Sequence, residues 1–123
     1  MRAYTIAATS LALGVTPKWL DNAVSHNKIP GVTQTRQGVS RRLNASSILI
    51  LELAIILGRS LGAPLSLALI VAERISAYRD TPLQLESGFT LLVDIAAIEH
   101  DLAVRLADAV EVAPAPRRGR PPR

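Results

Sequence analysis

The sequence predicts a mainly α-helical fold with a small β component, and three observations lead to that prediction. Apolar residues recur at helical spacing through most of residues 45–112, helix caps and turn residues divide the first 44 residues into short elements, and residues 83–93 alternate with a period of two. The 123 residues are enough for one modest core. We therefore expect two short N-terminal helices with a hairpin, then buried helices, a short strand or hairpin, and an amphipathic C-terminal helix.

The first helix is expected just before a tight turn. Ile6, Leu11 and Leu13 are spaced so that a short helix over residues 5–13 can bury them. Gly14 then supplies a turn at which a positive φ angle is expected, because glycine adopts that conformation at little cost.

The second helix has clear start signals and two distinct faces. Thr16 is a good N-cap, and Pro17 falls at the first helical position, where a missing N–H is no loss. Leu20, Ala23 and Val24 share one face. That face already fills the packing role, so we expect Trp19 to be exposed. The remaining side chains, which point elsewhere, are Lys18, Trp19, Asn22, Ser25 and His26.

A basic hairpin follows the second helix. Residues 32–36 predict a strand, Gln37-Gly38 a two-residue turn, and residues 39–43 the return strand. The hairpin carries Arg36, Arg41 and Arg42 and no acidic residue, and Asn44 is expected to cap a third helix. A helix-turn-helix with a basic wing is the organisation of a DNA-binding domain whose second helix enters the major groove.

These residues resemble a known family. The pattern LGVTPKWL…IPG…SRRLNASSILIL is similar to that of the MerR-like winged helix-turn-helix proteins, including the small excisionase-type regulators, over roughly the first half of the chain. The chain departs from the family at Asp21 and Asn22, where many members carry a basic or aromatic residue. With the helix-turn-helix and the basic wing, the resemblance implies double-stranded DNA as the partner. From their places on the second helix and the wing, we expect contacts from Thr16, Lys18, Trp19, Asn22, Ser25, Arg36, Arg41 and Arg42.

Charge is divided by segment. Residues 1–50 hold six Lys or Arg against one Asp, residues 51–112 hold four Arg against nine acids, and residues 113–123 hold four Arg and no acid. Both ends therefore suit a polyanion and the middle does not. We expect three parts: a DNA-binding domain over residues 1–61, a helical and β dimerisation region over 62–112, and a disordered tail over 113–123.

The middle of the chain is unusually apolar. A helix over residues 45–61 and a second one from Pro64 to about Tyr78 are apolar almost all round, so each needs cover on more than one side. A chain this small is expected to find that cover by forming a homodimer. Glu52 and Arg59 interrupt the apolar run, so we expect no membrane span. The absence of cysteine and of a signal-peptide pattern suits the cytoplasm.

The last ordered elements are expected to be a hairpin and a helix. Ser87-Gly88 is the expected turn within residues 83–93. From Asp94 the period is helical, and the apolar face closes the core or pairs with its copy in a dimer; both remain open. That face holds Ile95, Ile98, Leu102, Leu106 and Ala109 or Val110, while Glu99, Asp101, Arg105 and Asp108 face outward.

The tail resembles a minor-groove binder. Arg117, Arg118, Gly119 and Arg120, followed by Pro121, are similar to the core of an AT-hook, whose glycine lets extended backbone lie in a narrow groove between arginines. A tail rich in proline and arginine also occurs as a plain solubilising end.

Sequence-specific transcription regulation is the function we expect. The alternative is a protein-binding module, for example an antitoxin, that represses its own operon and binds a protein partner, such as a toxin, through its C-terminal region. Adjacent residues on a helix diverge, so Glu99-His100-Asp101 does not form a catalytic cluster. His26 and His100 have no neighbouring ligands at zinc spacing, and we expect no enzymatic activity, cofactor or metal.

Overall fold

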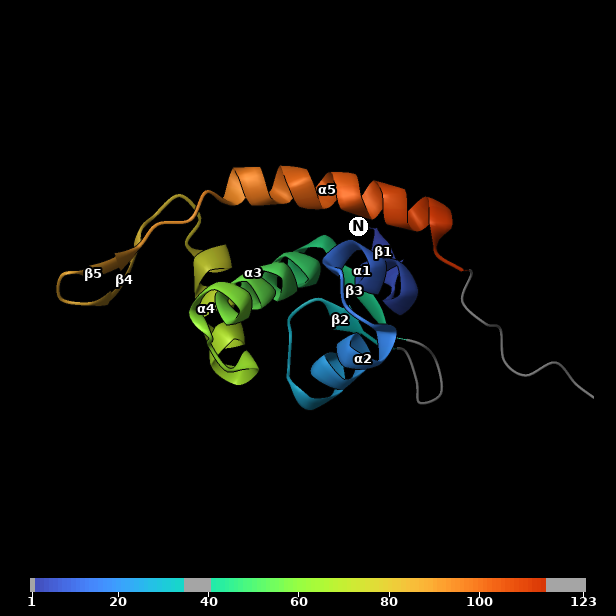
Figure 1. Cartoon of the computed structure of the whole chain (residues 1–123), viewed down its shortest axis with the longest axis horizontal. Helices are drawn as coiled ribbons and strands as arrows, with labels where there is room; N and C mark the ends of the chain where they lie inside the picture. The colour runs from blue at the N-terminus through green and yellow to red at the C-terminus, as the bar shows by residue number, and fades with distance from the viewer. Residues whose placement is uncertain (1, 35–40, 115–123) are drawn as a thin grey trace, which may run out of the picture.

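The computed structural model of the chain describes residues 2–34 and 41–114. Within these ranges the fold is mainly helical with two small sheets, which confirms the predicted fold class. One long helix runs along the side of the molecule, and a hairpin projects from one end (Figure 1). The elements are β1 (Ala3–Thr5), α1 (Ile6–Leu13), α2 (Pro17–His26), β2 (Val32–Thr33), β3 (Arg42–Asn44), α3 (Ala45–Leu61), α4 (Leu65–Ala77), β4 (Leu83–Glu86), β5 (Phe89–Leu91) and α5 (Ile95–Val112).

The predicted turn between the first two helices is confirmed. The Thr5 hydroxyl oxygen accepts a hydrogen bond from the Ala8 N–H at 3.0 Å and caps α1. Gly14 ends α1 in the left-handed region, with φ of 72°. Thr16 then caps α2 by accepting from the Trp19 N–H at 3.0 Å. These local bonds satisfy backbone donors that have no partner within a helix, and they fix where each helix begins.

A three-stranded sheet with the strand order β1-β3-β2 joins the first two helices to the rest of the chain. The pairing of β2 with β3 was expected; the pairing of β1 with the other side of β3 was not. Leu43 lies opposite Val32 on one side and Tyr4 on the other, so these three side chains share one face of the sheet. The expected turn at Gln37-Gly38 lies outside the described residues.

The two apolar helices have the predicted bounds. Asn44 caps α3 through a 2.9 Å hydrogen bond from the Ser47 N–H, Gly62 ends it with φ of 70°, and Pro64 precedes α4. α1, α4 and β3 pack against α3. Seven of its apolar side chains are buried, namely Ile48, Leu49, Ile50, Leu51, Leu53, Ala54 and Leu57. The expectation that a single chain cannot cover this helix is therefore wrong.

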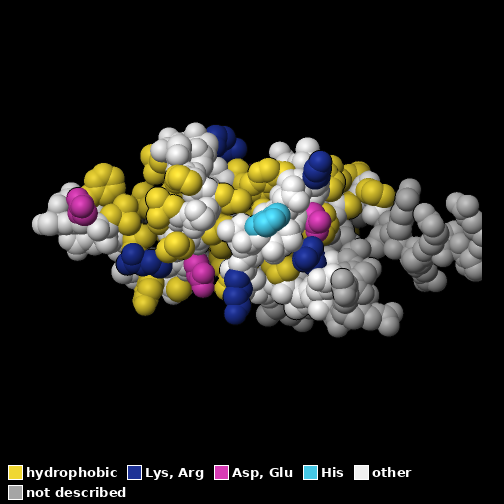
Figure 2. Space-filling view, turned by 90° about the horizontal axis from the view of Figure 1, so that it is seen from below, with side chains coloured by type: hydrophobic (Ala, Val, Ile, Leu, Met, Phe, Trp, Pro, Cys, Tyr) yellow, Lys and Arg dark blue, Asp and Glu magenta, His cyan; other side chains and the backbone are white. Residues whose placement is uncertain are grey.

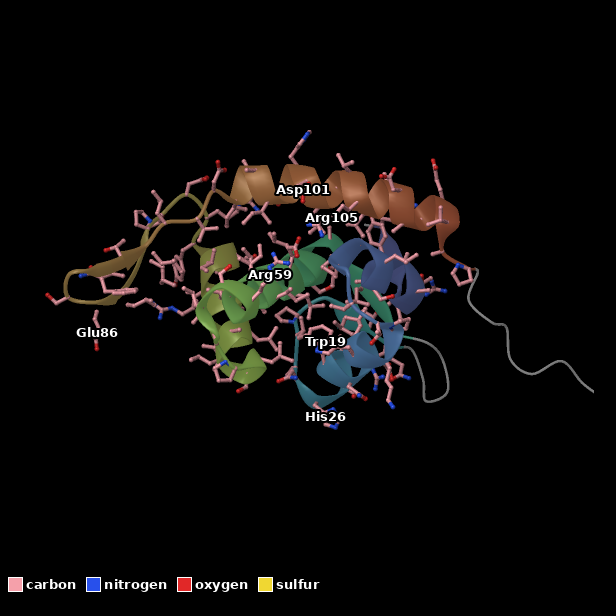
Figure 3. All side chains as sticks on the ribbon, in the orientation of Figure 1. Trp19, His26, Arg59, Glu86, Asp101 and Arg105 are labelled. Carbon is pink, nitrogen blue, oxygen red and sulfur yellow. The ribbon has the colours of Figure 1, made fainter. Side chains whose placement is uncertain are left out.

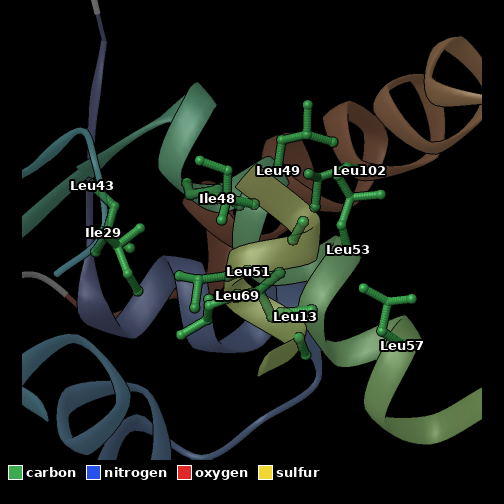
Figure 4. Close-up of a cluster of buried hydrophobic side chains, with 14 of the residues drawn as sticks. Leu13, Ile29, Leu43, Ile48, Leu49, Leu51, Leu53, Leu57, Leu69 and Leu102 are labelled. Atoms are coloured by element: carbon green, nitrogen blue, oxygen red, sulfur yellow. The ribbon is translucent and has the colours of Figure 1, made fainter. Parts of the chain in front are cut away.

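The core gathers leucine and isoleucine side chains from most elements (Figure 4). Leu13 of α1, Leu43 of β3, Leu69 of α4 and Leu102 of α5 all meet the buried residues of α3. The expected burial of Leu11 is wrong, because 52% of that residue is exposed. In α1 the small residues Ala8 and Ala12 face inward instead, where they let neighbouring helices approach closely.

The final hairpin and helix agree with the predicted pattern. β4 and β5 pair across Ser87-Gly88, where Gly88 has φ of 82°. The apolar face of α5 is buried, and α5 packs against α1. Ile95, Leu102, Leu106 and Ala109 of this face are covered within the chain, which is the core-packing alternative. No helix in residues 2–34 or 41–114 is long and apolar enough to span a membrane.

Two of the charged residues expected to face outward from α5 make contacts with other elements of the chain. Arg105 is half-buried and pairs with Glu52 of α3, which is itself buried. Glu99 pairs with Arg79, which follows α4. The outward assignment of Arg105 is therefore wrong, because a long guanidinium side chain can reach across to a neighbouring helix from a position beside the apolar face.

Candidate nucleic-acid interface

The position of α2 is fixed by its inner face. Leu20, Ala23 and Val24 are buried, as predicted, and anchor α2 against the core. Lys18, Asn22 and Ser25 are exposed on the outer side. Because residues four apart lie one above the other on a helix, Lys18 and Asn22 belong to one exposed stripe, with Ser25 beside it.

The C-terminal end of the stripe is held by local hydrogen bonds. The carbonyl oxygen of Asn22 accepts a bond from the Ser25 hydroxyl at 3.1 Å and another from Nδ1–H of His26 at 2.8 Å. His26 lies at the outer side of α2 (Figure 3). The sequence-based site omitted His26, although its spacing of four from Asn22 places it on the same stripe.

Trp19 does not project freely from α2. It is half-buried and packs against the core cluster, so the expected exposure is wrong (Figure 3). Position 19 lies at the margin of the inner face, four residues before the buried Ala23, where a large ring covers apolar surface. Trp19 therefore offers part of its indole ring to an outside partner rather than the whole side chain.

The two wing arginines among the described residues, Arg41 and Arg42, have different neighbours. Nη1 of Arg41 pairs with Oδ1 of Asp21 at 3.0 Å, so the hairpin arginine is joined to α2. The expected absence of acidic neighbours holds along the sequence but fails in space. Arg42 lies in β3 between Thr33 and Thr5, and cross-strand neighbours share one face of a sheet. Unlike Arg41, Arg42 has no ion-pair partner among the described residues.

Basic residues on this side of the molecule are dispersed. Lys18, Lys28, Arg41 and Arg42 surround α2 and the start of the wing, and Asp21 offsets one of their charges. Figure 2 views the molecule from the α2 side and shows separate basic side chains rather than a continuous basic surface. Each basic side chain here would therefore contact a partner separately and not as part of one basic surface. Five further predicted contacts lie outside the described residues, namely Arg36, Arg117, Arg118, Gly119 and Arg120.

The described residues contain no group of three or more His, Cys, Asp or Glu side chains placed to hold a metal ion. Polar side chains instead lie along one exposed surface of α2. The turn after α1, the buried inner face and the neighbouring strands hold this helix in place.

Comparisons with known proteins return no relative. No family model matches the chain, and no curated protein or solved structure matches it.

Proposed function

We propose that this protein is a sequence-specific DNA-binding transcription regulator that works as a dimer. The observation that carries the proposal is the exposed stripe of Lys18, Asn22 and Ser25 on a helix whose opposite face is anchored in the core. An anchored helix presents its side chains in fixed positions, which the reading of base edges in the major groove requires.

In this proposal the residues have different roles. Asn22 has no hydrogen bond from its side-chain amide within the described residues, and an amide can bind the N6 and N7 atoms of adenine together. Lys18 stands in the exposed first turn of α2 and binds phosphate or guanine. Arg42 on the wing contacts the backbone, which gives affinity without sequence information.

The proposal is tested first by selection of bound sites from a random DNA pool with the full-length protein. One enriched motif, present as two related half-sites, is the expected result for a two-fold dimer. Asn22→Ala should then weaken binding to the selected site by about 1–3 kcal/mol and leave binding to random DNA unchanged.

The wing is tested by a matched pair of arginine variants. Arg42→Ala should weaken binding to both DNA types and reduce the slope of log affinity against log salt by roughly one unit. Arg74→Ala removes the same charge from the exposed surface of α4 and should change neither. No enriched motif, together with equal effects of Arg42→Ala and Arg74→Ala, would contradict the proposal.

The C-terminal tail extends the contact in this proposal. Deleting residues 116–123 should lower affinity most when A·T-rich sequence flanks the site, where the minor groove is narrow. The guanine amino group obstructs deep insertion, so G·C-rich flanks should show a smaller loss. Equal losses on both flanks would contradict the AT-hook and favour a protein partner for the tail, as in an antitoxin.

A further inference from the structure

The β4–β5 hairpin leaves apolar side chains uncovered. Leu83, at its base, is buried, whereas Leu85 and Phe89 are 42% and 58% exposed. Leu92, just after β5, is 76% exposed. The hairpin projects from the end of the molecule, away from α2 (Figure 1). An isolated two-stranded hairpin is marginally stable in water, so packing on its exposed side would add substantially to its order.

An apolar groove lies at the base of the same hairpin. Its volume is about 430 Å³, and it is formed by the second half of α3, the segment that follows β5, and the start of α5. Ile56, Leu57, Leu61, Leu92 and Val93 contribute to its lining. The carboxylate that reaches this groove belongs to Asp94, which already accepts a hydrogen bond from the Ala97 N–H and caps α5.

A guanidinium stands beside the groove. Arg59 lines an adjoining hollow that shares Ile56, Ala97 and Ile98 with the groove (Figure 3). The other charged residues of that hollow are Glu52, Asp101 and Arg105, and they pair with one another. Among the described residues Arg59 has no ion-pair partner, so an acidic group arriving at the groove would meet an available cation.

The tip of the hairpin carries the complementary pair of groups. Glu86 lies directly opposite Phe89, so a carboxylate and a large apolar ring share one face. Within the described residues Glu86 has no ion-pair partner either. The tip thus offers an apolar group beside a negative charge, and the groove offers an apolar hollow beside a positive charge.

We propose that the groove receives the β4–β5 hairpin of a second copy of this chain, with Phe89 entering the groove and Glu86 pairing with Arg59. The tip and the groove lie at opposite ends of the β4–β5 hairpin. Two hairpins that run antiparallel therefore bring each tip to the groove of the other copy. This is the reciprocal arrangement that a two-fold interface requires. It leaves α2 of both copies open, since the hairpin lies at the far end of the molecule (Figure 1).

This inference rests on the dimer in the proposed function and specifies its interface. Its test uses the full chain without DNA. Sedimentation should give twice 13.2 kDa for the wild-type protein. Phe89→Asp should return the mass to 13.2 kDa, because a charge would replace the ring in an apolar groove. Leu67→Asp is the matched control: Leu67 is 52% exposed on α4 and should leave the dimer intact. Circular dichroism shows whether each variant stays folded.

A charge exchange tests the proposed pair itself. Glu86→Arg or Arg59→Glu alone should weaken the dimer by roughly tenfold per contact, and about a hundredfold with two contacts in each dimer. An equimolar mixture of the two variants should restore association, because every contact in the mixed dimer again joins opposite charges. Failure of the mixture to associate would overturn the pairing. A monomeric wild type, or dissociation by Leu67→Asp but not Phe89→Asp, would overturn the interface, and neither result depends on DNA binding.

Discussion

Arg105 of α5 is joined to the buried Glu52 of α3 by an ion pair beside the end of α1. Nη1 of Arg105 also donates to the carbonyl oxygen of Ala12 at 2.6 Å, in the last turn of α1, where carbonyls lack helical partners. Burial opposes the charge of Arg105, but the hydrogen bond and attraction from Glu52 outweigh it, so its pKa is raised. The C-terminal helix is thereby tied to the turn that positions α2.

Removal of this guanidinium should strongly destabilise the fold. Arg105→Ala leaves the carboxylate of Glu52 buried without a cation, and we expect a loss of about 2–3 kcal/mol in the free energy of unfolding. Solvent weakens the pair, because 34% of the Arg105 side chain is exposed, and this limits the loss. Urea denaturation measures the loss. Asp101→Ala is the control: its side chain is 71% exposed, and we expect a change below about 0.5 kcal/mol. Equal losses would show that the Glu52 pair contributes little.

A buried hydroxyl predicts a stabilising substitution. Thr9 is fully buried, and its Oγ1 has no hydrogen-bond partner among the described residues. Thr9→Val removes the unsatisfied group while keeping the shape, and should stabilise the protein by about 1 kcal/mol. Thr5→Val removes the cap of α1 and should destabilise it by about 1 kcal/mol. The midpoint temperature of thermal unfolding should therefore rise with Thr9→Val and fall with Thr5→Val. A lower midpoint temperature for Thr9→Val would mean that the Thr9 hydroxyl has a hydrogen-bond partner.

Gly31 should tolerate a side chain less well than Gly62. Both have positive φ, 87° and 70°, so alanine is strained at either position. A Cβ at Gly31 would also overlap the side chain of Asn44, which caps α3, whereas the space beside Gly62 is open. We expect Gly62→Ala to cost about 1 kcal/mol and Gly31→Ala at least about 2 kcal/mol in chemical denaturation. Similar costs would show that Asn44 moves aside without loss of its cap.

The Asp21–Arg41 pair should restrain DNA binding. Asp21→Asn removes a negative charge from α2 and frees Arg41 for a phosphate, so affinity should rise severalfold at low salt. The slope of log affinity against log salt should become steeper by roughly one unit. Fluorescence anisotropy at several salt concentrations measures both. In a protein that already carries Arg41→Ala, Asp21→Asn should leave the slope nearly unchanged. If the slope steepened there as much as in the wild type, the change would come from the charge of Asp21 alone.

The Arg79–Glu99 pair predicts a dependence of stability on acid. The hydrogen bond from Arg79, together with its charge, holds the pKa of Glu99 below its ordinary value, although burial acts in the other direction. A lowered carboxyl pKa means that the stabilisation is complete above the ordinary value and is lost as pH falls through the lowered one. Wild type should thus exceed Glu99→Gln in stability at neutral pH, with a difference that shrinks in acid. The effect should be small and weakened by salt, because both side chains are over 40% exposed. A difference that is independent of pH would contradict this assignment.

Local chemistry in the sequence determined where most elements begin and end. Thr16 with Pro17, Asn44, Gly14 and Gly62 act on backbone groups within a few residues, so their effects can be read from the chain alone. The inner face of α2 and the turn at Ser87-Gly88 follow from periodicity in the same way. The two short N-terminal helices with their turn, the two apolar helices and the final hairpin were therefore predictable.

Contacts between distant segments were decided only by the tertiary structure. Arg105 meets Glu52 across 53 positions, Arg41 meets Asp21 across 20, and β1 joins β3 although nothing in its three residues selects that partner. The same holds for burial: Leu11 is exposed and Trp19 half-covered because of which helices pack beside them. Periodicity states which residues share a face, but packing between elements decides which face is covered. The stripe on α2 was thus foreseeable, whereas the neutralised wing arginine and the uncovered hairpin were not.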